Sequence, residues 1–208
     1  MAFFASIKRA TKLVLKQNDR LDILMNNAGL AGIPPGMTAD GYEIQFGTNH
    51  MGPNLSTKLL LPLLQQQNKP TAILTTPKTP MQETRSITRY AQSKLGNYFF
   101  TKVCAQKYPA VKSVVVHPGT VNTGIWDSMF KKSYFGWLVF ILSTPFLTDV
   151  YNGAKRQLWA STANNLEVKN GAFYTLKGSQ YTQAILKNDK LANELWVWTE
   201  KEFAKHGF

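Results

Sequence analysis

The chain has 208 residues, of which 44% are hydrophobic, 17% are charged and one, Cys104, is a cysteine. This composition excludes collagen-like, disordered and disulfide-stapled proteins, because the chain is long and apolar enough to bury a core and one thiol cannot form an internal disulfide. Twenty-four Lys and Arg against twelve Asp and Glu give a formal net charge of +12. The cations are scattered in ones and twos without interleaved aromatic residues, so we expect no nucleic-acid partner.

Residues 1–17 are predicted to form an amphipathic helix, because Ile7, Thr11 and Val14 recur at intervals of three and four residues. The segment lacks an apolar core followed by a cleavage site, so we predict a cytoplasmic protein that is not secreted; a mitochondrial presequence is the alternative. Residues 134–147 are uncharged, but shorter than the roughly 20 residues that span a bilayer. We interpret them as a buried element, or as a substrate-facing flap or peripheral membrane contact.

Three short apolar runs have the pattern of strands covered on both faces, because they do not alternate with polar residues. They are residues 21–25, 71–75 and 111–116. Helical patterns alternate with them at residues 42–66, 89–107, 149–162 and 188–205. The sequence therefore predicts an α/β fold with a doubly wound parallel sheet. Pro53 falls inside the first of these helices and should kink it unless it lies in the first turn.

Polar turns follow the predicted strands, at the edge where ligands of such sheets bind. They are Asn26–Gly29, Thr75-Thr76 and Pro118–Gly124. Nearby in sequence, Tyr90 and Lys94 are four residues apart and so share a helix face. An ammonium beside a phenol lowers the pKa of the phenol toward neutrality, which suits proton transfer to or from a carbonyl or alcohol. Taken alone, such a pair is also common on a solvated helix.

Four motifs occur together in one order and spacing, and together they resemble those of the short-chain dehydrogenase/reductases. The motifs are Asn26-Asn27-Ala28-Gly29, Asn49 within FGTNHMG, Tyr90-x-x-x-Lys94, and Pro118-Gly119-Thr120-Val121-x-Thr123. The stretches YAQSKLGN and VHPGTVNTGIW resemble the retinol-dehydrogenase-like and WW-domain-oxidoreductase-like branch found in fungi. The resemblance implies a Rossmann-like fold, with residues 1–208 forming a single partial domain of this family.

The resemblance also implies catalytic roles for four side chains. Tyr90 would exchange a proton with the substrate oxygen, and Lys94 would lower its pKa and bind the nicotinamide ribose. Asn49 would hold a proton-relay water. Thr76 stands where the family usually has a Ser that polarises the substrate carbonyl, and its extra methyl group weakens that assignment.

Cofactor contacts are implied at two of the turns. Asn27, Ala28 and Gly29 would line the cofactor cleft, where small residues let the backbone approach the adenosine ribose. Val121 and Thr123 would contact the carboxamide and phosphates of NAD(H) or NADP(H). No metal site is expected, because the three histidines, His50, His117 and His206, have no ligand spacing and are interpreted as structural or exposed.

The glycine-rich TGxxxGxG turn with which this family begins is missing from the sequence. The nearest glycine cluster, residues 29–36, contains Pro34 and Pro35, which oppose a helix start there. By resemblance, residues 1–17 correspond to the helix before the fourth strand. We therefore expect an N-terminally truncated sheet without its first three strands, in which residues 21–25 form an apolar edge. The residue that separates NAD from NADP would be absent too.

Two functions stay open at this point. The first is an NAD(P)-dependent oxidoreductase that interconverts a small alcohol and a carbonyl. Its substrate would be apolar, because residues 125–147 are rich in aromatic and aliphatic side chains. The second is a catalytically inactive relative that acts as an interaction protein. It would dimerise through the helices at 42–66 and 89–107, which form the dimer interface in the family.

Overall fold

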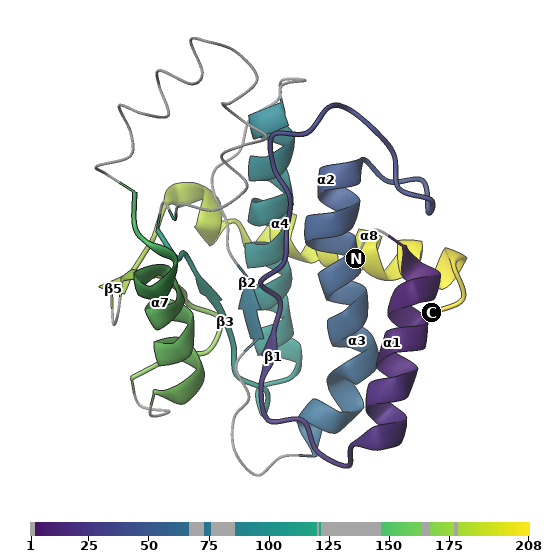
Figure 1. The fold of residues 1–208 in the computed structure, drawn as a ribbon, viewed down its shortest axis with the longest axis horizontal. Helices are drawn as coiled ribbons and strands as arrows, with labels where there is room; N and C mark the ends of the chain where they lie inside the picture. The colour runs from purple at the N-terminus through teal and green to yellow at the C-terminus, as the bar shows by residue number, and fades with distance from the viewer. Residues whose placement is uncertain are drawn as a thin grey trace.

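A five-stranded sheet lies at the centre of the fold (Figure 1). The structure is a computed structural model and describes residues 3–66, 73–75, 86–119, 121, 147–163, 167–176 and 179–208. The strands follow the order of the sequence: β1 (Leu24–Met25), β2 (Ile73–Thr75), β3 (Ser113–Val116), β4 (Phe173–Leu176) and β5 (Ser179–Gln180). Strands β1 to β4 are parallel, and β5 pairs with β4 in the antiparallel direction.

The predicted parallel α/β sheet is confirmed, with shorter strands than the apolar runs suggested. Strand β1 contains two of the five residues expected, because only Leu24 and Met25 pair with β2. Among the described residues β1 pairs on one side only, so it is an edge strand, as expected. Strands β4 and β5 were not predicted. The aromatic pair Phe173 and Tyr174, which begins two residues after Gly171, was the available signal for β4.

Helices cover both faces of the sheet. Side chains along β3 alternate between these two faces, so they show which helix lies on each. Val115 packs in a core with residues of α4 (Ser86–Lys107). Val114 and Val116 face the other way and pack with Ala160 of α7 (Val150–Thr162). All three valines are at most 1% exposed. A strand buried on both faces can therefore carry consecutive apolar residues, and these three valines were the clearest strand signal in the sequence.

Helix α8 (Asp189–Lys205) runs across α4, α3 (Gly52–Gln65) and α1 (Phe4–Gln17), as Figure 1 shows. The Trp196 ring stacks on Phe100 of α4 with 4.7 Å between ring centroids. Lys58 of α3 forms a 2.7 Å ion pair with Glu200. Phe203 is fully buried between α1 and α3, where it contacts the Phe4 ring edge to face. The C-terminal helix thereby ties the N-terminal helices to one another.

The segment at 42–66 is not the single α-helix that the sequence predicted. It contains a short helix α2 (Ile44–Phe46), a π-helical turn (Gly47–Met51) and then α3. Pro53 lies in the first turn of α3, where its missing N–H is tolerated, and the irregular backbone falls directly before it. Asn49 is in the middle of the π turn, so this irregularity sets the position of a predicted site residue.

Within the described ranges, no helix is both long enough and apolar enough to cross a membrane. The predicted membrane contact at 134–147 lies outside the described residues except for Leu147. That contact and the cytoplasmic location stay predictions.

Candidate active site

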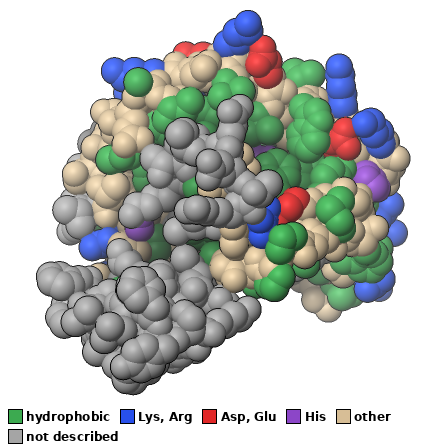
Figure 2. Space-filling view, turned by 90° about the horizontal axis from the view of Figure 1, so that it is seen from above, with side chains coloured by type: hydrophobic (Ala, Val, Ile, Leu, Met, Phe, Trp, Pro, Cys, Tyr) green, Lys and Arg blue, Asp and Glu red, His purple; other side chains and the backbone are tan. Residues whose placement is uncertain are grey.

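Several of the predicted site residues lie near the carboxyl ends of three adjacent strands. The parallel register pairs Met25 with Leu74 and Leu74 with Val114, so β1, β2 and β3 end at the same edge of the sheet. Helix α4 begins at this edge (Figure 1). Figure 2 views the molecule from this end. Outside the grey atoms, hydrophobic side chains on this face are mixed with other uncharged groups and backbone, and most charged side chains lie toward the margin.

Side chains of the preceding segment fix the start of α4. Arg89 forms a 2.8 Å ion pair with Glu43 and also donates to the carbonyl of Ile33. Ser86 donates to the same carbonyl at 3.1 Å. Because Tyr90 and Lys94 follow on this first part of α4, these contacts position the predicted catalytic pair relative to α2.

Lys94 is almost completely buried, with 4% of its surface exposed. Its ammonium nitrogen lies 5.5 Å from the centre of the Tyr90 ring, which places the two side chains together as predicted. Within the described part of the chain, this nitrogen has neither a carboxylate nor a hydrogen-bond acceptor. Burial lowers the pKa of Lys94 to about 8, because a buried ammonium is poorly solvated.

The lowered pKa of Lys94 predicts a stability that rises with pH. Between about 8 and 10.5 the unfolded chain holds a proton on this lysine that the folded chain releases, so raising the pH through this window favours folding. The variant Lys94→Met should lose this part of the pH dependence. Urea unfolding at several pH values would measure it, and equal pH slopes for the two proteins would contradict the buried environment of Lys94.

Tyr90 differs in one respect from the expectation. Its side chain is half-buried, and burial raises the pKa of the phenol. The sequence predicted that Lys94 would lower it. In the chain alone desolvation causes this shift, because a buried phenolate is poorly solvated.

Asn49 is fixed by hydrogen bonds to two neighbouring segments. Its Oδ1 accepts from the backbone N–H of Leu30 at 2.8 Å, and its Nδ2 donates to the carbonyl of Leu30 at 2.8 Å. The same Nδ2 lies 3.1 Å from Oγ of Ser93, which in turn donates to the carbonyl of Tyr90. Ser93 was not among the predicted site residues, although it lies directly before Lys94. It links the π turn to α4.

Gly29 lies against both Asn49 and Lys94. A Cβ atom at this residue would be 3.0 Å from Asn49 Oδ1 and 3.1 Å from Lys94 Nζ. The absence of a side chain therefore lets the turn after β1 approach these two groups closely. Asn49, Gly29 and Lys94 thus lie together, with Tyr90 beside Lys94, and these four residues form one cluster.

We expect Gly29→Ala to destabilise the chain by about 1 kcal/mol, because the new methyl group must displace Asn49 or Lys94. Gly36→Ala is a matched control, since its Cβ would meet only Ile44 Cγ2, at an ordinary 3.7 Å. Urea unfolding measures both. If the two variants were equally stable, the close approach at Gly29 would be disproved.

The other cofactor-binding candidates lie nearer α7. Asn27 and Ala28 are exposed, and Asn27 Oδ1 accepts a 2.6 Å hydrogen bond from Gln157. Val121 packs closely on Gly153 of α7. A Cβ atom added to Gly153 would lie 2.6 Å from Val121 Cγ2. Thr76 and Thr123 lie outside the described residues.

Two further polar groups hold the turns and were not assigned roles from sequence. Asn26 is buried, and its Nδ2 donates to Thr57 of α3 at 2.9 Å, which anchors the turn after β1. The guanidinium of Arg156, in α7, lies against Gly119. A Cβ atom added to Gly119 would be 2.5 Å from Arg156 Nη1. Arg156 comes 37 residues after Gly119 in the sequence, so only the fold brings them together.

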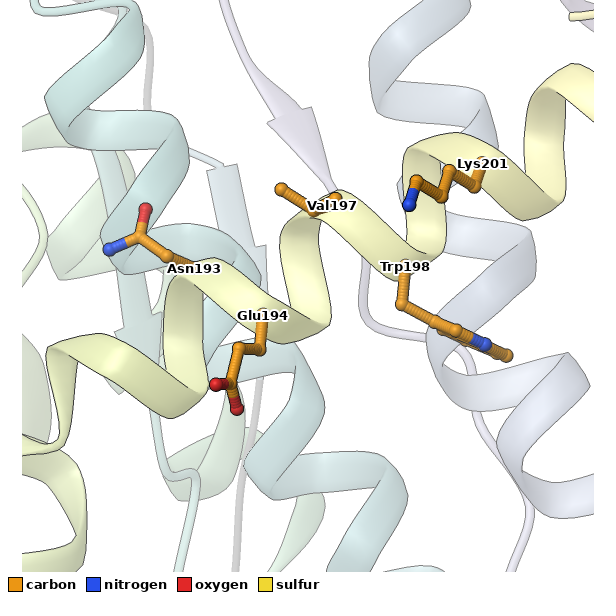
Figure 3. Close-up of a pocket in the computed structure, with 5 residues that line it drawn as sticks. All are labelled: Asn193, Glu194, Val197, Trp198 and Lys201. Atoms are coloured by element: carbon orange, nitrogen blue, oxygen red, sulfur yellow. The ribbon is translucent and has the colours of Figure 1, made fainter.

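A surface pocket elsewhere contains none of these residues. It lies on α8 and is lined by Asn193, Glu194, Val197, Trp198 and Lys201 (Figure 3). Because all five come from one helix, the pocket is a shallow depression with no converging chemical groups, and the cluster around Lys94 is the better candidate site.

Comparison with known proteins identifies the family. Residues 1–133 match the family model of the short chain dehydrogenases. The chain belongs to this family. It is 30% identical over 206 residues to retinol dehydrogenase 12 of Mus musculus, a match that covers 92% of this chain and 64% of that protein. The chain thus spans less than two thirds of the length of this curated relative.

Solved structures of this fold resemble the chain at lower sequence identity. An uncharacterized protein from Mycobacterium paratuberculosis matches with a TM-score of 0.70 and 22% identity, over 97% of this chain and 72% of that one. The NADPH-bound carbonyl reductase from chicken fatty liver matches with a TM-score of 0.61 and 23% identity, over 88% of this chain and 74% of that one. These likenesses confirm the Rossmann-like α/β fold that the sequence predicted.

Proposed function

We propose that the protein is an oxidoreductase that interconverts an alcohol and a carbonyl with NAD(H) or NADP(H), using Tyr90 and Lys94. One observation carries this proposal. A nearly buried ammonium lies beside a phenol ring and a bare glycine, and the described residues offer it no partner. Family membership supports the reaction type.

The cluster fits the ribose and nicotinamide portion of such a cofactor. The Lys94 ammonium has three N–H donors and needs an acceptor, which a ribose hydroxyl provides. Gly29 lies close to that nitrogen and has no side chain to cover it. Asn27, Ala28 and Val121 are proposed to line the same cleft. When bound, the nicotinamide would supply or accept the hydride.

Tyr90 is proposed to move the proton. Because burial raises its pKa, the phenol is protonated at neutral pH and can donate to the oxygen of a carbonyl substrate. The phenolate left behind is stabilised by the Lys94 ammonium next to the ring. Asn49 is proposed to orient a water that returns the proton. Thr76 and Thr123 stay predictions, as does an apolar substrate, because they rest on segments outside the described residues.

Binding of NADPH to the purified chain tests the proposal directly. We expect Lys94→Met to weaken binding by about tenfold or more, because a charged hydrogen bond is lost. Lys107→Met is the matched control. It removes the same charge from the same helix, near Trp196 and away from the cluster. Equal loss in both variants would mean that NADPH responds only to net charge, and the proposed site would be wrong.

The second candidate, an inactive interaction protein, is favoured by the edge position of β1. An edge strand offers unpaired backbone groups to another chain. A dimer through 42–66 and 89–107 would have to use surfaces that α8 leaves uncovered, because α8 packs on both α3 and α4. A chain that forms dimers at micromolar concentration and binds neither NADPH nor NADH would support this candidate over the first.

A further inference from the structure

A chain of buried hydrogen bonds runs from Asn49 into the core and is not used by the proposed chemistry. The backbone carbonyl of Asn49 accepts from Asn97 Nδ2 at 2.7 Å. The other amide atom, Asn97 Oδ1, lies 3.1 Å from His50 Nδ1. All three residues are at most 2% exposed. Sequence reasoning treated His50 as structural or exposed and assigned Asn97 no role.

The carbonyl of Asn49 needs this donor because of Pro53. In a regular α-helix the N–H of residue 53 would donate to the carbonyl of residue 49, but proline has no N–H. A buried carbonyl without a donor is costly. Asn97 comes from α4, so its amide both satisfies the carbonyl and ties the π turn to the helix that carries Tyr90 and Lys94.

His50 determines which way the Asn97 amide points. Asn97 can donate to Asn49 and still contact His50 only if its oxygen accepts from a protonated Nδ1. Nε2 then keeps its lone pair and can accept from Asn54 Nδ2, which lies 3.3 Å away. Asn54 Nδ2 also lies 3.0 Å from Nδ1, but it cannot donate to that nitrogen while Nδ1 carries a proton. Burial lowers the pKa of His50 to about 4, so the ring is neutral at physiological pH.

We propose that Asn97 and His50 are positioning residues that hold Asn49 against Gly29 and Lys94. This inference rests on the proposed function for its chemical meaning. The amide of Asn97 fixes the backbone of Asn49, and the fixed backbone directs the Asn49 side chain to Leu30, next to the ammonium of Lys94. Asn97 thereby fixes the position of α4 relative to the turn after β1, with Asn49 between them.

The tautomer of His50 in the unaltered chain is the first test. Nitrogen-15 NMR of the imidazole at neutral pH should show a protonated Nδ1 and an unprotonated Nε2. The opposite tautomer would overturn the proposal, because Asn97 would then have to donate to His50 and turn its oxygen toward the carbonyl of Asn49.

Amide exchange at Leu30 is the second test, because the N–H of Leu30 donates to the Asn49 side chain. We expect Asn97→Leu to speed exchange of this amide by about tenfold. Cys104→Ala is the matched control, since it also disturbs a buried side chain of α4 but one without contact to Asn49. If Leu30 exchanges no faster in Asn97→Leu than in Cys104→Ala, the positioning role is wrong.

These readouts separate this inference from the proposed function. The His50 tautomer reports on the orientation of Asn97, and amide exchange at Leu30 reports on Asn49. Neither measurement requires turnover or cofactor. NADPH binding by Lys94→Met instead reports on the proposed site. Where turnover is measured, Asn97→Leu should lower kcat more than it raises KM, because the displaced Asn49 supports proton transfer. A change in KM alone would overturn the positioning role in the reaction.

Discussion

Tyr90→Phe should reduce turnover of alcohols and ketones by about a hundredfold to ten-thousandfold, the range that general acid–base groups contribute. The substitution removes the phenolic oxygen and leaves the ring, so the packing of Lys94 over the ring face is kept. Stability and NADPH binding should therefore change little. The measurement follows oxidation of NADPH and reduction of NADP with a panel of apolar ketones and secondary alcohols.

Tyr98→Phe is the control for this experiment. Tyr98 lies two turns further along α4, is buried, and packs against Phe173 in the core. It should turn over substrate like the unaltered chain. Unchanged rates in Tyr90→Phe would eliminate this tyrosine as the proton donor, whereas an equal loss in both variants would assign the effect to the helix and not to the hydroxyl.

The parts of the fold that the sequence predicted are those in which local pattern and tertiary environment agree. The valines of β3 are apolar on both faces because helices cover both, and this leaves a continuous apolar run. The spacing of Tyr90 and Lys94 needed only a regular helix to bring them together, and α4 provides it. Motif order then assigned the cluster to a family.

Other features depend on contacts that no local pattern encodes. The sequence predicts an ordinary helix around Asn49, where the structure has a π turn. Pro53 indicates that the helix is irregular there, but it does not indicate a π turn. The pairing of Asn97 with the Asn49 carbonyl joins residues 48 apart in sequence. Burial of Tyr90 likewise comes from the tertiary structure. It raises the pKa of the phenol in the chain alone, whereas the sequence pattern indicated only the neighbouring ammonium.

The path of α8 also depends on tertiary contacts that no local sequence pattern encodes. Its amphipathic pattern predicted a helix but not that it would cross α1, α3 and α4. Its buried side chains, among them Trp196 and Phe203, join separate parts of the core. Residues at the two ends of the chain meet there, since Phe4 contacts both Phe203 and Phe208.

Phe203→Ala should therefore destabilise the chain by about 3 to 5 kcal/mol, the usual cost of emptying a fully buried aromatic site. That is a large fraction of the roughly 5 to 15 kcal/mol that stabilises a typical domain. The loss should loosen α1 as well as α8, because Phe203 packs between α1 and α3. Urea unfolding measures the stability, and hydrogen exchange in α1 measures the local effect.

Val197→Ala on the same helix is the control, because Val197 is 50% exposed and loses few contacts. It should cost less than about 1 kcal/mol. Similar losses in the two variants would show that α8 contributes only its own helical structure. A large loss confined to Phe203→Ala, with faster exchange in α1, would show that the C-terminal helix holds the N-terminal helix in place. The position of α1 bears on the proposed site through two contacts. Phe4 of α1 packs against Tyr42. The next residue, Glu43, forms the ion pair with Arg89 at the start of α4.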